Sequence, residues 1–348
     1  MLQNETLDEL EERYQKGGLV LALGAGVSKD CKLPTWPELL SRLAARNFGE
    51  GGVSLCQQLM AGGYSFPAIA SMLEAKSPSS SDFSELIREE LYREFPFFPD
   101  GITKENRQDF IQFVNDNNPT IRAVASLLAR RNDGKPAYVP NPFIHAVVNF
   151  NLDAVLQAYV RARCRPDRIL RTTERPSAGS KQGLVNVYHM HGFLRFDKKH
   201  IRDPKKEAPD LRVFTEQEYF NFFNQPNSLF NYTFLYLLRE WSCLFIGMSM
   251  KDDNIRRLLH YSKTEREQSH AREGRSADKA ERKSTRHFAI LRRSSEEMDH
   301  LAETSLELLG THILWVTDYR KEIPQLLAHI YKSTGGDWQA VYENRPGA

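Results

Sequence analysis

Short apolar runs alternate with amphipathic stretches along most of the chain, which predicts strands connected by helices. Residues 18–23, GLVLAL, have the composition of a buried strand, whereas residues 4–16 place Leu7, Leu10 and Tyr14 on one helical face. The predicted strands are 18–23, 143–150, 184–192, 243–250, 287–293 and 312–318. The predicted helices of this part are 4–16, 36–47, 152–162, 216–225, 227–241, 252–262 and 320–333, with one more between Ser294 and Gly310. This alternation predicts an α/β fold, with a Rossmann-like, doubly wound parallel sheet of about six strands.

Residues 50–139 have a different pattern. Helical periodicity recurs over 53–61, 66–75, 82–94, 105–115 and 119–131, and we find no convincing strand pattern there. We therefore predict a single domain over residues 1–348. Its α/β core comprises residues 1–49 and 140–335, and a helical insertion covers about 50–139.

Two polar signals refine these boundaries. Thr35 and Glu38 form a capping box for the helix over 36–47, and Ser294 and Glu297 form another for the helix that ends at Gly310. Residues 262–286 mix both charge signs with almost no large apolar side chain, which predicts a charged, mobile loop.

The composition is that of an ordinary globular protein. Of the 348 residues 41% are hydrophobic, and the net charge of +2 gives no reason to expect direct nucleic-acid binding or a membrane partner. The apolar runs are too short to cross a bilayer. The four cysteines are scattered without a CxxC pair, so we predict free thiols, a cytoplasmic protein and no structural metal.

The candidate chemistry begins at Gly24-Ala25-Gly26, directly after the first predicted strand. The third glycine of a dinucleotide-binding motif is missing, and so is the lysine of a P-loop. Taken alone, the pair of glycines fits a tight turn as well as a phosphate cradle.

Polar residues also follow three other predicted strands. Asn151 and Asp153 follow the strand 143–150, His191 ends the strand 184–192, and Gly247 and Ser249 end the strand 243–250. Carboxyl ends of parallel strands meet at one edge of a sheet, so we expect these residues to line a common crevice.

These motifs carry a resemblance. GAGVS, NFNLD, HMHG and IGMSM, in this order, resemble the GAG-x-S, TQNID, HG and GTS motifs of the sirtuin (SIR2) family. The deacylase branch of that family has a four-cysteine zinc ribbon, whereas residues 193–242 contain no cysteine. The segments PTWPELL, VFTEQEYFNFF and LFIGMSMKDDNIRRLL instead resemble bacterial SIR2-like defence proteins.

The resemblance implies an NAD+ hydrolase that releases nicotinamide and ADP-ribose, with NAD+ as substrate and no metal. It also implies an effector that depletes NAD+ in antiphage defence by abortive infection. Relatives of this kind form homo-oligomers, and some pair with a HerA-like ATPase or with a short Argonaute.

The resemblance also implies roles for individual residues. Asn151 would hold a water or a ribose hydroxyl, and His191, with an unperturbed pKa of about 6.5, would act as the base. The NAD-binding residues implied are Gly24, Ala25, Gly26 and Ser28 at the diphosphate and ribose, Asp153 at the carboxamide, and Gly247 and Ser249 at the adenosine.

Each of these assignments has a structural alternative. Asn151 and Asp153 also suit a helix cap, Asp252 or Asp253 suits another, and we expect His189 to be structural. For the whole chain, the alternatives are a non-catalytic module that binds NAD or ADP-ribose and a zinc-less protein deacylase. If Gly26 serves the diphosphate, a bulky replacement should abolish NAD binding and leave the fold intact.

Overall fold

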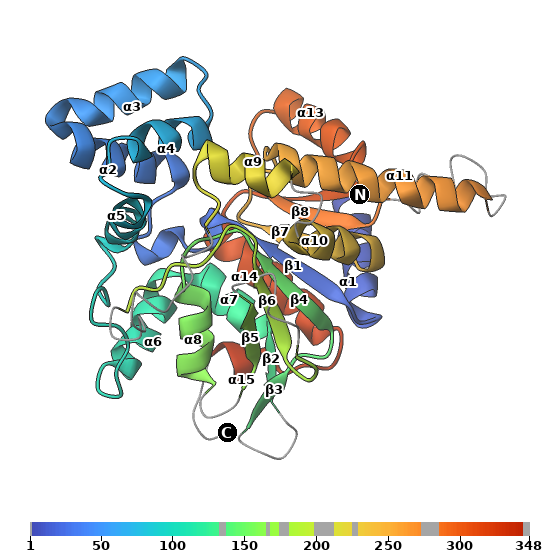
Figure 1. The fold of residues 1–348 in the computed structure, drawn as a ribbon. Coiled ribbons are helices and arrows are strands. Elements are labelled where there is room, and N and C mark those ends of the chain that lie inside the picture. The colour runs from blue at the N-terminus through green and yellow to red at the C-terminus, as the bar shows by residue number, and fades with distance from the viewer. Residues whose placement is uncertain are drawn as a thin grey trace.

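A seven-stranded parallel sheet forms the centre of the molecule (Figure 1). The computed structural model describes residues 2–131, 137–164, 168–173, 181–197, 212–224, 229–272 and 285–343. The strand order is β5-β6-β4-β1-β7-β8-β9. The strands are β1 (Leu19–Leu23), β4 (Ile144–Asn149), β5 (Leu170–Thr173), β6 (Val185–His189), β7 (Cys243–Ile246), β8 (His287–Arg292) and β9 (Thr311–Val316). The α/β, Rossmann-like prediction is confirmed, with one strand more than predicted.

The sheet is doubly wound around β1. From β1 the chain moves to β4 on one side and later crosses to β7 on the other side, and both neighbours pair with β1 in parallel. The strand order therefore reverses at β1. In open α/β sheets, the carboxyl ends of the strands at such a point form the usual ligand crevice.

Helices cover both faces of the sheet. Leu19, Leu21 and Leu23 of β1 face one core, while Val20 and Ala22 face the other, as the two-residue period of a strand requires. The first core includes α1 (Leu2–Gln15), α2 (Trp36–Phe48), α8 (Val155–Arg163), α14 (Tyr319–Lys332) and α15 (Trp338–Tyr342). The second includes α10 (Leu229–Glu240), α11 (Asp253–Arg272) and α13 (Glu296–Glu307), and α9 (Glu216–Asn224) lies near them (Figure 1).

The predicted insertion is mainly helical. It contains α3 (Gly52–Ala61), α4 (Phe66–Glu74), α5 (Ser80–Tyr92), α6 (Arg107–Asn117) and α7 (Pro119–Leu127). The expectation of no strand was wrong, because β2 (Ala129–Arg131) pairs antiparallel with β3 (Tyr138–Pro140). In this hairpin Arg131 lies over the ring of Tyr138, a cation–π contact. Strand β2 has the sequence ARR, which lacks the alternation of apolar and polar residues that would predict a strand.

Two predicted boundaries are corrected. Residues 262–272, expected in the charged loop, belong to α11, while residues 273–284 lie outside the described residues. The helix continues because its charged side chains face carbonyls: Arg266 donates to the carbonyl of Leu238 (3.1 Å), and Lys263 donates to that of Glu307 (3.0 Å). The cap of α13 is Ser295, one residue after the predicted one, and its hydroxyl accepts from the Met298 amide.

The other predicted cap is present. The Thr35 amide donates to the Glu38 carboxylate (2.7 Å) at the start of α2. None of the described helices has a stretch long and apolar enough to span a membrane.

Candidate functional site

The turns after β1 and β7 touch each other. The Gly24 amide donates to the carbonyl of Ile246 (3.0 Å), and the Gly26 amide donates to that of Gly247 (3.0 Å). A Cβ atom on Gly26 would lie 2.9 Å from the Gly247 Cα, and one on Gly24 would lie 2.6 Å from the Gly247 oxygen. Gly247 has a φ of +69°, which other residues rarely adopt.

The expectation that a bulky Gly26 variant keeps its fold is therefore wrong. A side chain there would collide with the backbone of the β7 turn, so the glycines are first of all required for close packing of two turns. Gly26 is nevertheless exposed and Ala25 half-buried, so part of this turn is accessible from outside the protein. Its contact with a diphosphate stays a prediction.

Asn151 is held beside this turn at the end of β4. Its side-chain Nδ2 donates to the carbonyl of Gly24 (2.9 Å) and lies 3.5 Å from the Ser28 hydroxyl. The Asn151 residue is only 7% exposed, and its Oδ1 atom is buried without a hydrogen-bond partner among the described residues. A buried acceptor of this kind costs stability, so the site can gain by binding a donor such as water or a hydroxyl group.

Asp153 has a structural contact of its own. One carboxylate oxygen accepts from the Val155 amide (3.0 Å) at the start of α8, but the N-cap of that helix is Ala154, so Asp153 supports the turn before the helix without being its cap. Burial raises the pKa of Asp153, and hydrogen bonds from Val155 and Ser28 partly oppose this rise. Ser28 thus lies between Asn151 and Asp153.

His191 lies two residues beyond β6 and is 7% exposed. Its ring is 5.3 Å from that of Phe150 and 5.8 Å from that of Tyr219. Burial lowers the pKa of His191, whereas the Asp252 carboxylate and a backbone hydrogen bond at Phe150 act in the opposite direction. The imidazole is therefore neutral near pH 7 and able to accept a proton.

Two residues near His191 were missed as site residues. The Tyr219 hydroxyl donates to one oxygen of Asp252, and the other oxygen accepts from the Ile255 amide (3.0 Å). Asp252 was expected only as a cap, which it is. Tyr219 lies in the segment VFTEQEYFNFF, whose resemblance to the defence proteins was a signal that could have identified it.

His189 plays the structural part expected of it. Its Nδ1 lies 3.3 Å from the Asn151 carbonyl oxygen, and its other ring nitrogen contacts the Gln157 side chain. Burial lowers the pKa of His189 to about 4, so the ring is neutral. His189 therefore supports the loop that carries Asn151.

Ser249 follows the end of β7 by three residues and is exposed. No hydrogen bond within the described part of the chain joins it to Asn151 or His191. The structure thus brings together Gly24, Gly26, Ser28, Asn151, Asp153 and Gly247, with His191 connected through Phe150.

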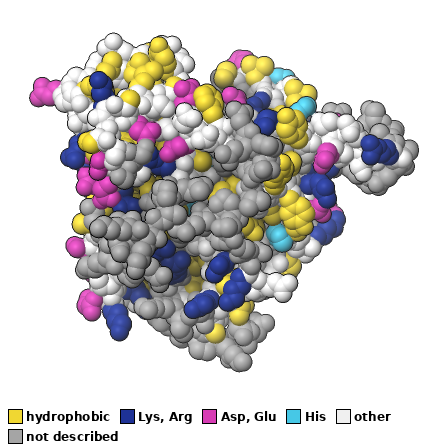
Figure 2. All heavy atoms as spheres, viewed as in Figure 1, with side chains coloured by type: hydrophobic (Ala, Val, Ile, Leu, Met, Phe, Trp, Pro, Cys, Tyr) yellow, Lys and Arg dark blue, Asp and Glu magenta, His cyan; other side chains and the backbone are white. Residues whose placement is uncertain are grey.

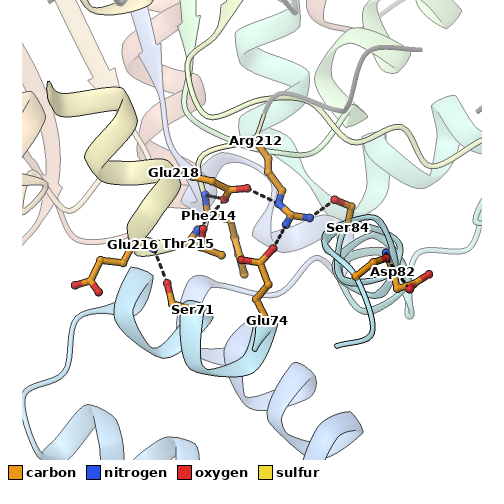
Figure 3. A network of polar contacts seen from close by, with 10 residues as sticks. Ser71, Glu74, Asp82, Ser84, Arg212, Phe214, Thr215, Glu216 and Glu218 are labelled. Atoms are coloured by element: carbon orange, nitrogen blue, oxygen red, sulfur yellow. Dashed lines mark hydrogen bonds and ion pairs between the residues drawn. The ribbon is translucent and has the colours of Figure 1, made fainter. Parts of the chain in front are cut away.

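Arg212 connects this region to the insertion (Figure 3). Its guanidinium contacts Glu74 of α4 (2.6 Å), Glu218 of α9 (2.9 Å) and the hydroxyl of Ser84 of α5. Arg212 also forms a β-bridge with Gly192, and the next amide, of Val213, donates to the His191 carbonyl (2.9 Å). No sequence pattern indicates this cluster, because Glu74 and Ser84 are more than 120 residues away from Arg212 and Glu218 along the chain.

Metal ligands were not expected in this chain. Among the residues that the structure describes, no three or more His, Cys, Asp or Glu side chains form a group able to hold a metal ion. The independence of the reaction from a metal stays a prediction.

Comparison with known proteins finds one similarity, to a family model. Residues 145–313 match the family model described as a SIR2-like domain, a match that includes Asn151, Asp153, His191, Gly247 and Ser249. The glycine turn after β1 precedes the matched residues and joins them through the sheet. No curated protein matched the chain. SIR2-like domains are in general NAD-dependent enzymes, and residues 145–313 of this chain are similar to such a domain.

Proposed function

We propose that this protein hydrolyses NAD+ to nicotinamide and ADP-ribose. The observation that carries the proposal is the state of Asn151, whose Nδ2 is fixed on Gly24 while its Oδ1 is buried with no partner among the described residues. An amide acceptor held in this way fits a site that positions a water or a ribose hydroxyl.

The proposed roles follow from the local chemistry. Cleavage of the bond between nicotinamide and the ribose C1′ leaves an oxocarbenium-like centre that water attacks. Asn151 orients the hydroxyl or water through Oδ1, and neutral His191 takes up the proton that is released. Asp153 accepts from the carboxamide NH2. The turn of Gly24, Ala25, Gly26 and Ser28 borders the diphosphate, and Gly247 and Ser249 border the adenosine.

The biological role is proposed on the resemblance alone. We propose that NAD+ depletion serves antiphage defence, that the chain self-assembles, and that a HerA-like ATPase or a short Argonaute controls it. Light scattering of the purified chain tests self-assembly, and co-expression with neighbouring genes tests the partner.

A fluorescent NAD analogue, ε-NAD, tests the hydrolase directly, with and without the candidate partner. We expect Asn151→Ala and His191→Ala each to lower turnover by about 100-fold or more, because the first loses the acceptor that orients the water or hydroxyl and the second loses the base. The exposed positions Asn4 and His300 supply matched controls, Asn4→Ala and His300→Ala, which should retain full turnover. Thermal melting of every variant verifies the fold.

Three outcomes would contradict the proposal. Turnover that is the same in all variants removes these residues from the reaction. NAD binding without turnover indicates a non-catalytic binding module. Turnover that depends on an acylated peptide indicates a zinc-less deacylase.

A further inference from the structure

A cavity of about 890 Å³ lies next to the candidate site. It is bordered by residues 102–107, by one side of α8, by the edge strand β5 and by residues 193–197. Gln157 of α8 and Ala154, which precedes that helix, line it, but Asn151, His191 and the glycine turns are not among its described lining residues. Its volume is within the range of small-molecule sites, which is about 300–1,000 Å³.

The walls of this cavity are strongly basic. Among the described residues of its lining, the cationic side chains are Lys104, Arg107, Arg161, Arg168, Arg171, Lys181 and Arg195, and the one carboxylate is Asp197. The whole chain, in contrast, has a net charge of only +2. Figure 2 shows Lys and Arg side chains gathered over α8 and the neighbouring edge of the sheet.

Most of these cations are not neutralised by the parts of the protein that the structure describes. No ion pair with a described carboxylate involves Lys104, Arg107, Arg168, Arg171 or Lys181. The Nε atom of Arg107 is also buried without a described hydrogen-bond partner. Like-charged groups around a concave surface repel one another and concentrate a positive potential, which a bound anion relieves.

The cavity also has an apolar side. Ile102, Leu184 and Phe196 line it, and the guanidinium of Arg195 lies 5.7 Å from the ring centre of Phe193. Such a surface accommodates a ring or a sugar, and Arg side chains bind phosphate oxygens in a bidentate manner. The ligand that fits both sides carries several phosphates and one planar, weakly polar group.

We propose that this cavity binds a nucleoside polyphosphate, at a site separate from that of NAD+. NAD+ matches the cavity poorly, because its two phosphate charges are partly offset by the nicotinamide cation. A long nucleic-acid strand also matches poorly, since the cationic groups surround a cavity of limited volume and do not follow an open groove.

Binding of mant-ATP to the full chain, followed by fluorescence, tests the proposal. We expect saturable binding that ATP and inorganic tripolyphosphate compete away and that adenosine does not. Arg107→Gln and Arg168→Gln should each weaken binding about tenfold, the usual effect of losing a charge-assisted hydrogen bond. Lys321→Gln and Arg46→Gln remove a cation far from the cavity and should change binding by less than about twofold.

Several results would overturn the proposal. One is equal loss of binding in the cavity variants and the distant variants. Another is competition by adenosine as strong as that by ATP. Displacement of mant-ATP by NAD+ with the same sensitivity to Arg168→Gln would make the cavity part of the NAD site. A single-stranded oligonucleotide that competes where tripolyphosphate fails would indicate a nucleic-acid surface. Arg168 is exposed, so its variant remains informative if Arg107→Gln does not fold.

Discussion

His191 lies against Phe150 and Tyr219, and the hydroxyl of Tyr219 is bound by Asp252. The aromatic surroundings exclude water and favour the neutral imidazole, while the negative charge of Asp252 favours the protonated form. Burial and the charge of Asp252 thus shift the pKa of His191 in opposite directions. Only the charge of Asp252 can be removed by a substitution that leaves the core intact.

Replacement of Asp252 by asparagine tests this balance. The pKa of His191 should fall further, because the charge that raises it is gone, so the acid limb of the pH profile of kcat/KM for ε-NAD should move to lower pH. Asparagine still has an oxygen for the Ile255 amide, which preserves the helix cap. Asp253→Asn at the exposed neighbouring position is the control. An acid limb that moves to higher pH, or moves equally in both variants, would contradict the assignment of His191 as the base.

At the scale of single residues, the sequence predicted the site residues that follow strands. It missed the residues that contact them from other parts of the chain. Asn151 and His191 could be identified because strand ends are visible in the pattern of apolar residues. Tyr219 and Asp252 approach His191 from helices α9 and α11, and no local pattern encodes that approach. Gly24 and Gly26 pack against Gly247, which is far away in the sequence. The sequence alone could therefore not distinguish glycines required for close packing from glycines that bind a phosphate.

At the scale of elements, Arg212 determines how the insertion meets the core. Its side chain is 3% exposed, and it joins α4, α5 and α9 to the segment that pairs with Gly192. A buried cation with two carboxylate partners is costly to disrupt, because removing it leaves both carboxylates without their counter-charge.

We expect Arg212→Met to lower the free energy of unfolding by about 3 kcal/mol, the usual cost of breaking a buried ion pair. Arg212→Lys keeps the charge and should cost less, although it cannot contact three partners with one planar group. Lys16→Gln, which breaks an exposed pair with Glu12, should cost less than about 1 kcal/mol. Urea unfolding followed by circular dichroism measures all three variants, and equal values for Arg212→Met and Lys16→Gln would refute the central role of Arg212.

The elements that the sequence missed are those with little apolar character. Strand β5, LRTT, lies at the edge of the sheet and buries only Thr173 fully, so it lacks a buried-strand pattern. Helix α11 was ended too early because Lys263 and Arg266 are buried along their apolar stems while their charged ends bind carbonyls. Polar residues that are buried in a strand or helix therefore lead a sequence-based prediction to a loop.

At the scale of the whole molecule, the insertion and the sheet share a single core. Phe83 of α5, Phe110 of α6 and Val124 of α7 belong to the same buried cluster as Leu21 of β1 and Leu327 of α14. The insertion is therefore expected to fold together with the sheet.

Differential scanning calorimetry should accordingly show one unfolding transition, with a calorimetric enthalpy close to the van't Hoff enthalpy. Phe83→Ala in the insertion and Leu327→Ala in the core should both lower the temperature of that one transition, since each leaves a cavity that costs about 2–5 kcal/mol. Met298→Ala, at an exposed position of α13, is the control. A separate early transition that only Phe83→Ala shifts would show that the insertion is an independent domain.

The Arg212 cluster has a consequence for the order of folding. Its bonds to Glu74 and Ser84 span 138 and 128 residues of sequence, and the bond from Asn151 to Gly24 spans 127. Contacts of such long range form late, because a long loop must close before they can contribute to stability. A nascent or partly unfolded chain would then lack the positioned side chains of Asn151 and His191. If the protein consumes NAD+, that activity would begin only once the chain is fully folded. Incompletely folded chains would then not deplete the NAD+ of the cell.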